Sequence, residues 1–217
     1  MLNKNLILSI LLLFTTYSFA GNINKEKPKY LWFDAEANFE RFSSKDSISY
    51  YLEKAKDVGF NQVVVDVKPI YGEVLYKSKI LPPLTTVHNK VIERDWDYLQ
   101  YFIDEAHRLG LKVTVSTAVF TAGHPATCEG LVYEDKRWNG KTCLEYMSNN
   151  KMLDIRDDKQ KVGAFLNPVR KDVRNFALSI IREIVKNYDI DAYALDYCRY
   201  PADNSDFSNE TRKAFEN

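Results

Sequence analysis

Residues 59–66 read Gly-Phe-Asn-Gln-Val-Val-Val-Asp, a glycine-led turn and an apolar run that ends in a carboxylate. Such a run of valines is typical of a strand that is buried on both faces, as in parallel sheets. A helical pattern of apolar side chains precedes it at residues 48–58. The same unit of helix, short break and strand recurs at residues 99–119 and 173–196. This alternation predicts an α/β fold in which helices wrap a parallel sheet.

The expected elements are short strands and helices with polar residues at their starts. Strands are predicted at residues 30–33, 62–67, 113–119 and 192–195, and a last helix at residues 211–215. Side chains that can accept hydrogen bonds from the first backbone N–H groups precede the helical patterns: Ser43 or Ser44, Asp95, and Asn167 with Pro168 after it.

Loop length differs between the two ends of the predicted strands. The segments after the strands, at residues 68–94 and 120–165, are long, whereas the breaks before the strands are short. In βα-barrels the long loops build the active face, so the asymmetry favours a (β/α)8 TIM barrel, of which this chain holds about the first four βα units. A doubly wound sheet is the alternative, but no Gly-x-Gly-x-x-Gly phosphate loop follows Phe33.

Half of a barrel has two unpaired sheet edges and one uncovered sheet face. We therefore expect residues 21–217 to be the amino-terminal part of a barrel domain from a longer protein, or the product of a truncated gene. Residues 1–20 carry an apolar centre at 6–14 and end in Ser18-Phe19-Ala20, which predicts a signal peptide and export to the periplasm or the medium. An uncleaved membrane anchor is the alternative.

Composition narrows the expected partners. Acidic and basic residues balance at 30 each, so the charge gives no reason to expect nucleic acid as a partner, or stable membrane insertion once the signal peptide is removed. Cys128 and Cys143 lie in one loop-like segment and are either bridged or free, whereas Cys198 is left unpaired.

Four groups of residues, within 59–78, 97–111, 166–168 and 188–201, resemble in this order the sequence pattern of the glycosyl-hydrolase-like 10 family. The last group includes Asp196-Tyr197-Cys198-Arg199-Tyr200-Pro201. The resemblance implies a TIM-barrel glycoside hydrolase that acts on a polysaccharide. Members of this family include an enzyme that cleaves peptide-free glycan strands of peptidoglycan. The chain departs from the pattern at Lys68, where the family often has Arg.

Asp196 is the expected catalytic residue. It ends an apolar strand, where an ionised carboxylate is costly unless it has a purpose. Glycoside hydrolysis uses two carboxyl groups, one to protonate the leaving oxygen and one to attack the sugar or activate water. The alternative is a structural aspartate that caps the following turn or pairs with Arg199.

Further polar residues near the strand ends are expected to bind the substrate: Asp34, Glu36, Asp66, Lys68, His124, Asn167, Arg199 and Tyr200. Because side chains alternate along a strand, Asp66 and Lys68 should share one side, as a salt bridge or as the charged floor of a sugar site. Asn167 is alternatively a helix cap, and His124 a solvated loop residue. Arg199 can pair with a carboxylate, and Tyr200 can stack on a sugar ring.

Three functions compete at this stage. A glycoside hydrolase is favoured, and a carbohydrate-binding barrel without catalysis is the main alternative. A metal-dependent hydrolase or deacetylase is disfavoured, because no His-x-His follows the first strand and the three histidines are scattered. We therefore expect a polysaccharide partner and neither a metal nor another cofactor.

Overall fold

The computed structural model describes residues 27–216, so the predicted signal peptide lies outside the described residues. Its centre is a four-stranded parallel sheet in the order β1-β2-β5-β8, formed by β1 (Tyr30–Phe33), β2 (Gln62–Lys68), β5 (Lys112–Ala118) and β8 (Ala192–Asp196). The α/β prediction is confirmed. The spatial order of the strands follows the chain order, without the reversal that defines a doubly wound sheet.

The helices that connect these strands are α2 (Lys45–Asp57), α3 (Tyr98–Arg108) and α5 (Lys171–Asn187). Ser44 caps α2 as predicted, since its side chain accepts a hydrogen bond from Ser47 N. The prediction for α3 is wrong by two residues, because Asp97 and not Asp95 accepts from Gln100 N, at 3.1 Å. No helix within residues 27–216 is long and apolar enough to cross a membrane.

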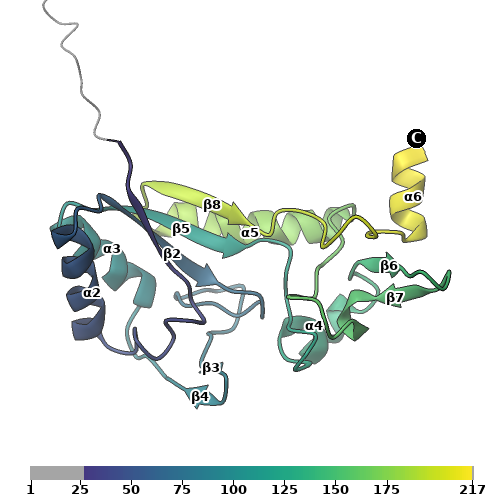
Figure 1. Ribbon diagram of the computed structural model, residues 1–217, viewed down its shortest axis with the longest axis horizontal. Helices are drawn as coiled ribbons and strands as arrows, with labels where there is room; N and C mark the ends of the chain where they lie inside the picture. The colour runs from purple at the N-terminus through teal and green to yellow at the C-terminus, as the bar shows by residue number, and fades with distance from the viewer. Residues whose placement is uncertain (1–26, 217) are drawn as a thin grey trace, which may run out of the picture.

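The long loops are folded and gather at the carboxyl ends of the strands. The strand arrows of β2, β5 and β8 point towards the part of the molecule that holds α4, β6 and β7 (Figure 1). The remaining elements are β3 (Thr86–Val87), β4 (Lys90–Val91), α4 (Leu131–Glu134), η1 (Lys136–Trp138), β6 (Leu144–Tyr146), β7 (Met152–Asp154), η2 (Ile155–Asp157) and α6 (Asn209–Glu216). The carboxyl ends of the strands therefore carry the loops that are long enough to shape a binding site.

The hydrophobic core lies on one face of the sheet. Alternate strand residues such as Val63, Val65 and Val115 are buried together with Leu52 of α2 and Phe102 of α3. The opposite face is different, because its aromatic side chains on β1 remain accessible, Trp32 to 49% and Tyr30 to 52%. The outer strands of the sheet, β1 and β8, each pair with one neighbour within the described residues. One sheet face is thus covered by helices, and the other is open along β1, although Val64 and Ser116 of the central strands are buried there.

Two loops at the carboxyl edge are packed in direct backbone contact. Leu131 N, in the first residue of α4, donates to Tyr71 O at 3.0 Å. Gly130 has φ of 98°, and a Cβ atom on it would lie 2.5 Å from Tyr71 O and 2.9 Å from Gly123 Cα. Neither atom can retreat, because both belong to the backbone of packed loops. Only glycine fits where the loop after β2 meets the loop after β5.

Gly130→Ala should destabilise the fold by roughly 2–3 kcal/mol, because both the positive φ and the backbone clash oppose a Cβ atom. Gly140→Ala is the matched control, since Gly140 also has a positive φ of 71° but no atom within 4 Å of an added Cβ. It should cost only about 1 kcal/mol. Urea denaturation of the two variants measures the difference, and equal losses would contradict the tight contact.

Candidate active site

Three predicted carboxylates lie together at the carboxyl ends of the parallel strands, a region that we call the rim. Asp34 follows β1, Asp66 is in β2 and Asp196 ends β8. The charge of Asp34 raises the pKa of Asp66, and the pKa of Tyr197 is raised by burial and then by Asp196, with Glu36 and Asp34 adding to it. Each of these residues therefore lies within electrostatic reach of its neighbours, as expected for the ends of adjacent parallel strands.

Asp66 is the most perturbed of these carboxyls. Burial and the charge of Asp34 raise its pKa to about 7. Hydrogen bonds from the backbone N–H groups of Lys68, at 3.3 Å, and Ala35 oppose this shift without cancelling it. A carboxyl group with this pKa carries a proton in a large fraction of molecules near neutral pH, which is the property a general acid needs.

Lys68 forms no ion pair with Asp66, and its charge is the smallest of the influences that lower the pKa of Asp66. A β-bulge between the two residues breaks the strict alternation on which the same-side prediction rested, and they pair with the adjacent residues Ser116 and Thr117 of β5. The Lys68 ammonium donates instead to the carbonyls of Ala118, at 2.5 Å, and Thr121, at 2.8 Å. The expected salt bridge is replaced by a tie between β2 and the loop after β5. Burial lowers the pKa of Lys68 to about 8.

The other two rim aspartates use their carboxylates in short local hydrogen bonds. Asp34 Oδ1 accepts from Ala37 N at 2.7 Å, which fixes the turn after β1. Asp196 Oδ1 accepts from Tyr197 N at 2.8 Å, and the backbone of Asp196 accepts from Val119 N at 2.8 Å. Both side chains are exposed, so each keeps acceptor capacity for a ligand.

The contacts of Arg199 and Tyr200 differ from the roles expected of these residues. Arg199 forms no ion pair with Asp196 but lies over the rings of Tyr197, at 5.3 Å, and Phe165, at 5.6 Å, while its Nη1 donates to two carbonyls of the following residues. Tyr200 packs against the small cluster of Cys143, Ile155 and Phe165. Both residues therefore support the loop after β8.

Asn167 is neither a helix cap nor free to bind a substrate. Helix α5 begins only at Lys171, and no side chain caps it. The Asn167 amide donates to Asp206 Oδ2 at 2.6 Å and also lies within hydrogen-bonding distance of Ser208 and Thr211. It is 2% exposed. Its amide is used to fasten the segment that leads into α6.

Glu36 and His124 lie on a part of the rim formed by the loops after β1, β2 and β5. The pKa of Glu36 is raised by burial and by Asp34. The imidazole of His124 stacks on the ring of Tyr71, with centroids 5.8 Å apart and an interplanar angle of 19°. Tyr71 was not predicted from the sequence, because an isolated tyrosine in a long loop gives no local signal of the carboxylates that surround it.

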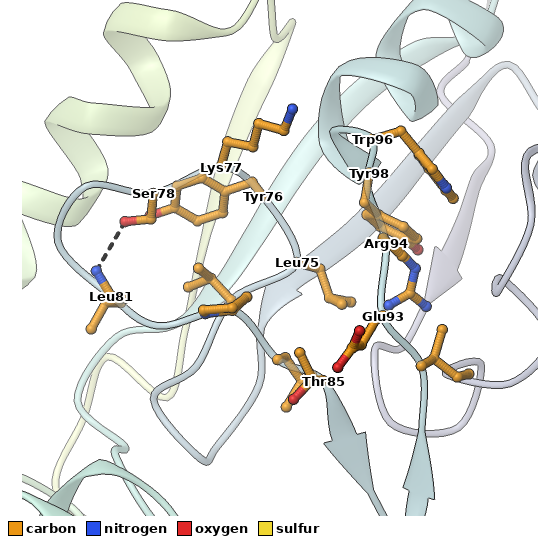
Figure 2. A pocket seen from close by; sticks show the side chains of 14 residues that line it. Leu75, Tyr76, Lys77, Ser78, Leu81, Thr85, Glu93, Arg94, Trp96 and Tyr98 are labelled. Atoms are coloured by element: carbon orange, nitrogen blue, oxygen red, sulfur yellow. Dashed lines mark hydrogen bonds between the residues drawn. The ribbon is translucent and has the colours of Figure 1, made fainter.

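A cleft of about 520 Å³ lies beside this rim, between the segments 74–85 and 92–98. Figure 2 shows Arg94, Trp96 and Tyr98 on one of its walls and Leu75 with Tyr76 on the other. None of the predicted site residues lines it. Tyr98 lines the cleft and also lies within electrostatic reach of Asp66 at the rim, because the charge of Asp66 contributes to raising the pKa of this buried phenol. Sequence reasoning missed Tyr98, whose helical position predicts only a core residue.

The part of the chain that the structure describes contains three cysteines and no metal-binding cluster. Cys128, Cys143 and Cys198 are all free, so the bridge between Cys128 and Cys143 is not formed. Cys143 is buried between strands of the long loop, whereas Cys128 is exposed beside Lys159. Among residues 27–216, no group of three His, Cys, Asp or Glu side chains is arranged to hold a metal ion.

Comparisons of the sequence with known proteins find one family model and several partial relatives. Residues 29–217 match the family model described as Glycosyl hydrolase-like 10. An S-layer-related protein of Niallia circulans is 35% identical over 200 residues, which are 88% of this chain and 12% of that protein. Glycosyl hydrolase DigH of Escherichia coli K12 is 28% identical over 149 residues, which are 67% of this chain and 32% of DigH. The chain thus spans a minor part of both relatives.

Solved structures share the fold. A hypothetical protein from Ruminiclostridium thermocellum superposes with a TM-score of 0.53 at 19% identity, over 82% of this chain and 80% of that one. Alpha-L-fucosidase isoenzyme 2 from Paenibacillus thiaminolyticus superposes with a TM-score of 0.54 at 20% identity, over 80% of this chain and 22% of the fucosidase. At these identities the likeness extends to the fold alone.

The carboxyl carbon of Asp66, followed by NMR, should titrate with a midpoint of about 7. Asp34→Asn removes a neighbouring negative charge but retains the acceptor for Ala37 N, so the midpoint should fall. Asp57→Asn removes an equal charge from the exposed end of α2 and should leave the midpoint unchanged. An Asp66 midpoint near 4, the ordinary range for aspartate, would show that the carboxyl is well solvated and would contradict this description.

Proposed function

We propose that this chain, which belongs to the glycosyl hydrolase-like 10 family, carries catalytic carboxyl groups of a glycoside hydrolase that acts on a polysaccharide. The observation that supports the proposal is that two carboxyl groups with different surroundings lie at the carboxyl ends of the strands. Asp66 is half-buried and has a raised pKa, whereas Asp196 is exposed. Hydrolysis of a glycosidic bond requires one carboxyl that donates a proton and one that is ionised.

In the proposed mechanism Asp66 protonates the oxygen of the departing sugar. Asp196 then acts as the ionised group, either by attacking the anomeric carbon or by taking a proton from the attacking water. The two residues lie on strands separated by β5 and are offset by two register positions, so their backbones are roughly 10 Å apart across the sheet and about 7 Å apart along it. Side chains of this length can flank one glycosidic bond from that spacing.

The remaining predicted site residues divide into two groups in this proposal. Asp34, Glu36 and His124 face the rim and bind sugar hydroxyls. Four others keep the loops in place for them: Lys68, Asn167, Arg199 and Tyr200. Lys68 matters most among these, because its ammonium connects β2 to the loop that carries His124.

We further propose that the sheet belongs to a TIM barrel whose later strands cover the open face. Trp32 and Tyr30 on that face are about half exposed, and parallel sheets of this class are covered on both faces. The relatives of this chain are several times longer than the segment they share with it. Export and a peptidoglycan glycan substrate also remain proposals, the latter supported by the family to which the chain belongs.

Asp196→Asn should lower kcat by about 10³ in the full-length protein, because the amide can neither attack nor accept a proton. Asp203→Asn is the matched control, as Asp203 is an exposed carboxylate in the same loop, and it should leave kcat within about twofold. Release of reducing sugar from peptide-free peptidoglycan strands measures both. Unchanged turnover in Asp196→Asn would remove this residue from the mechanism, and glycan binding without turnover in the unmodified protein would favour a non-catalytic binding barrel.

The pH profile should report the proton on Asp66. Because a general acid must be protonated, kcat/KM should fall as the pH rises above about 7. Asp34→Asn should move this alkaline limb to lower pH, since the charge of Asp34 helps to raise the pKa of Asp66. A limb that stays in place in Asp34→Asn would assign the proton donor to another group.

A further inference from the structure

Arg94 carries a positive charge that no carboxylate balances within residues 27–216. Its guanidinium lies over the rings of Phe39, at 5.1 Å, and Tyr98, at 5.3 Å. Nη2 donates to the carbonyls of Phe39 and Phe42, at 3.3 and 3.2 Å, whereas Nε is buried and has no hydrogen-bond partner among the described residues. Charged side chains that are withdrawn from water are normally paired. The guanidinium is therefore held in place, while its charge lacks a counterion in this part of the chain.

Arg94 lines the cleft of about 520 Å³ that lies beside the rim. Figure 2 shows its side chain on the wall formed by residues 92–98, across from Leu75. Among the described residues, Lys77 of the lining forms no ion pair, and Glu93 is the one acidic side chain of the lining. Cations therefore outnumber acids around the cleft, which favours a negatively charged ligand.

Both walls of the cleft are attached to chain segments that leave the strands at the rim. Leu75, on one wall, donates its backbone N–H to Val67 O at 2.8 Å, directly after Asp66 in β2. Arg94, on the other wall, holds residues 39–42 of the loop after β1 through two carbonyls. Walls that are fixed in this way lose little conformational entropy when a ligand binds. A ligand in the cleft therefore lies next to the carboxyl groups of the proposed active site.

The lining of the cleft also suits a sugar ring. Tyr76 and Trp96 contribute aromatic rings from opposite walls. A sugar ring has C–H groups that pack on aromatic side chains and hydroxyl groups that form hydrogen bonds at its edge. The volume lies in the range of small-ligand sites, roughly 300–1,000 Å³. A carboxylate attached to such a ring supplies the anion that Arg94 lacks.

We infer that this cleft is a subsite for a sugar unit that bears a carboxylate and is recognised by Arg94, so that the preferred polysaccharide is acidic. The carboxylate accepts hydrogen bonds from the guanidinium while the sugar ring packs against Trp96. A lactyl ether and a uronic acid are two sources of the same group, and the binding measurements separate them. The inference rests on the proposed function, because the bound unit is a neighbour of the glycosidic bond that is cleaved.

The first measurement compares each acidic oligomer with the same oligomer after its carboxyl groups are converted to methyl esters. Calorimetry with the full-length protein at neutral pH and low salt uses two series, peptide-free glycan oligomers that contain N-acetylmuramic acid and oligomers of galacturonic acid. In the series that fits the cleft, the acid should bind about tenfold more tightly than the ester. The series with this preference identifies the source of the carboxylate. Added salt should reduce the difference.

The second measurement repeats the comparison with two variants. Arg94→Gln removes the cation and should bring the ratio of acid to ester affinity close to one. Lys79→Gln is the matched control, because Lys79 is an exposed cation of the same loop that does not line the cleft, and it should keep the ratio within about twofold. Thermal unfolding checks that both variants fold. If Arg94→Gln does not fold, the comparison of acid and ester in the unmodified protein decides the question.

Equal binding of acid and ester in both series, together with turnover of a glycan, would overturn the subsite and leave the proposed function standing. Absence of both binding and turnover for every oligomer would overturn the subsite and the proposed function together. An unchanged ratio in folded Arg94→Gln would remove Arg94 from recognition and overturn the inference. Inorganic sulfate that displaces the acidic oligomer at equal concentration would overturn the sugar assignment in favour of a small anion.

Discussion

The contact of the Lys68 ammonium with the carbonyls of Ala118 and Thr121 determines the chemistry of the rim. An ammonium two residues from an aspartate would ordinarily hold the carboxylate ionised. Here the bulge in β2 directs the cation to the backbone of the loop after β5 instead. Asp66 is consequently left with burial and a like charge as its main influences, and its pKa rises. One buried cation thus anchors a loop and is only a minor influence on the neighbouring acid, whose pKa burial and Asp34 raise.

The same loop is held a second time by backbone packing. Gly130 lets it approach Tyr71 so closely that a side chain would collide with the carbonyl oxygen. Together with the Lys68 contact, this fixes His124 and Glu129 relative to the strand that carries Asp66. Functional side chains on loops are positioned well only when such contacts make the loops rigid. The rim therefore combines long loops with the positional accuracy of the sheet.

Local sequence patterns predicted the parts of the site that depend on chain direction and periodicity. Asp34, Asp66 and Asp196 were identified because each follows or ends an apolar strand, and parallel strands bring such residues to one edge. The patterns failed where a distant partner decides the outcome. Asn167 has the sequence context of a helix cap and its Oδ1 accepts from Val169 N, yet α5 begins only at Lys171, and its amide nitrogen donates to Asp206, 39 residues further along the chain. The bulge before Lys68 and the carboxylates around Tyr71 are likewise tertiary features that no local pattern records.

The open face of the sheet links stability to the proposed chemistry. Small side chains, Ser116 of β5 and Ala194 of β8, lie in register with Asp66 on this face. Trp32 on β1 is half exposed on the same face, and fully burying a large apolar side chain stabilises a protein by roughly 1.5–3 kcal/mol. A layer that packs on Trp32 would also exclude water from the region above Asp66. Lower polarity there disfavours the ionised carboxylate further, so covering this face stabilises the fold and raises the pKa of Asp66.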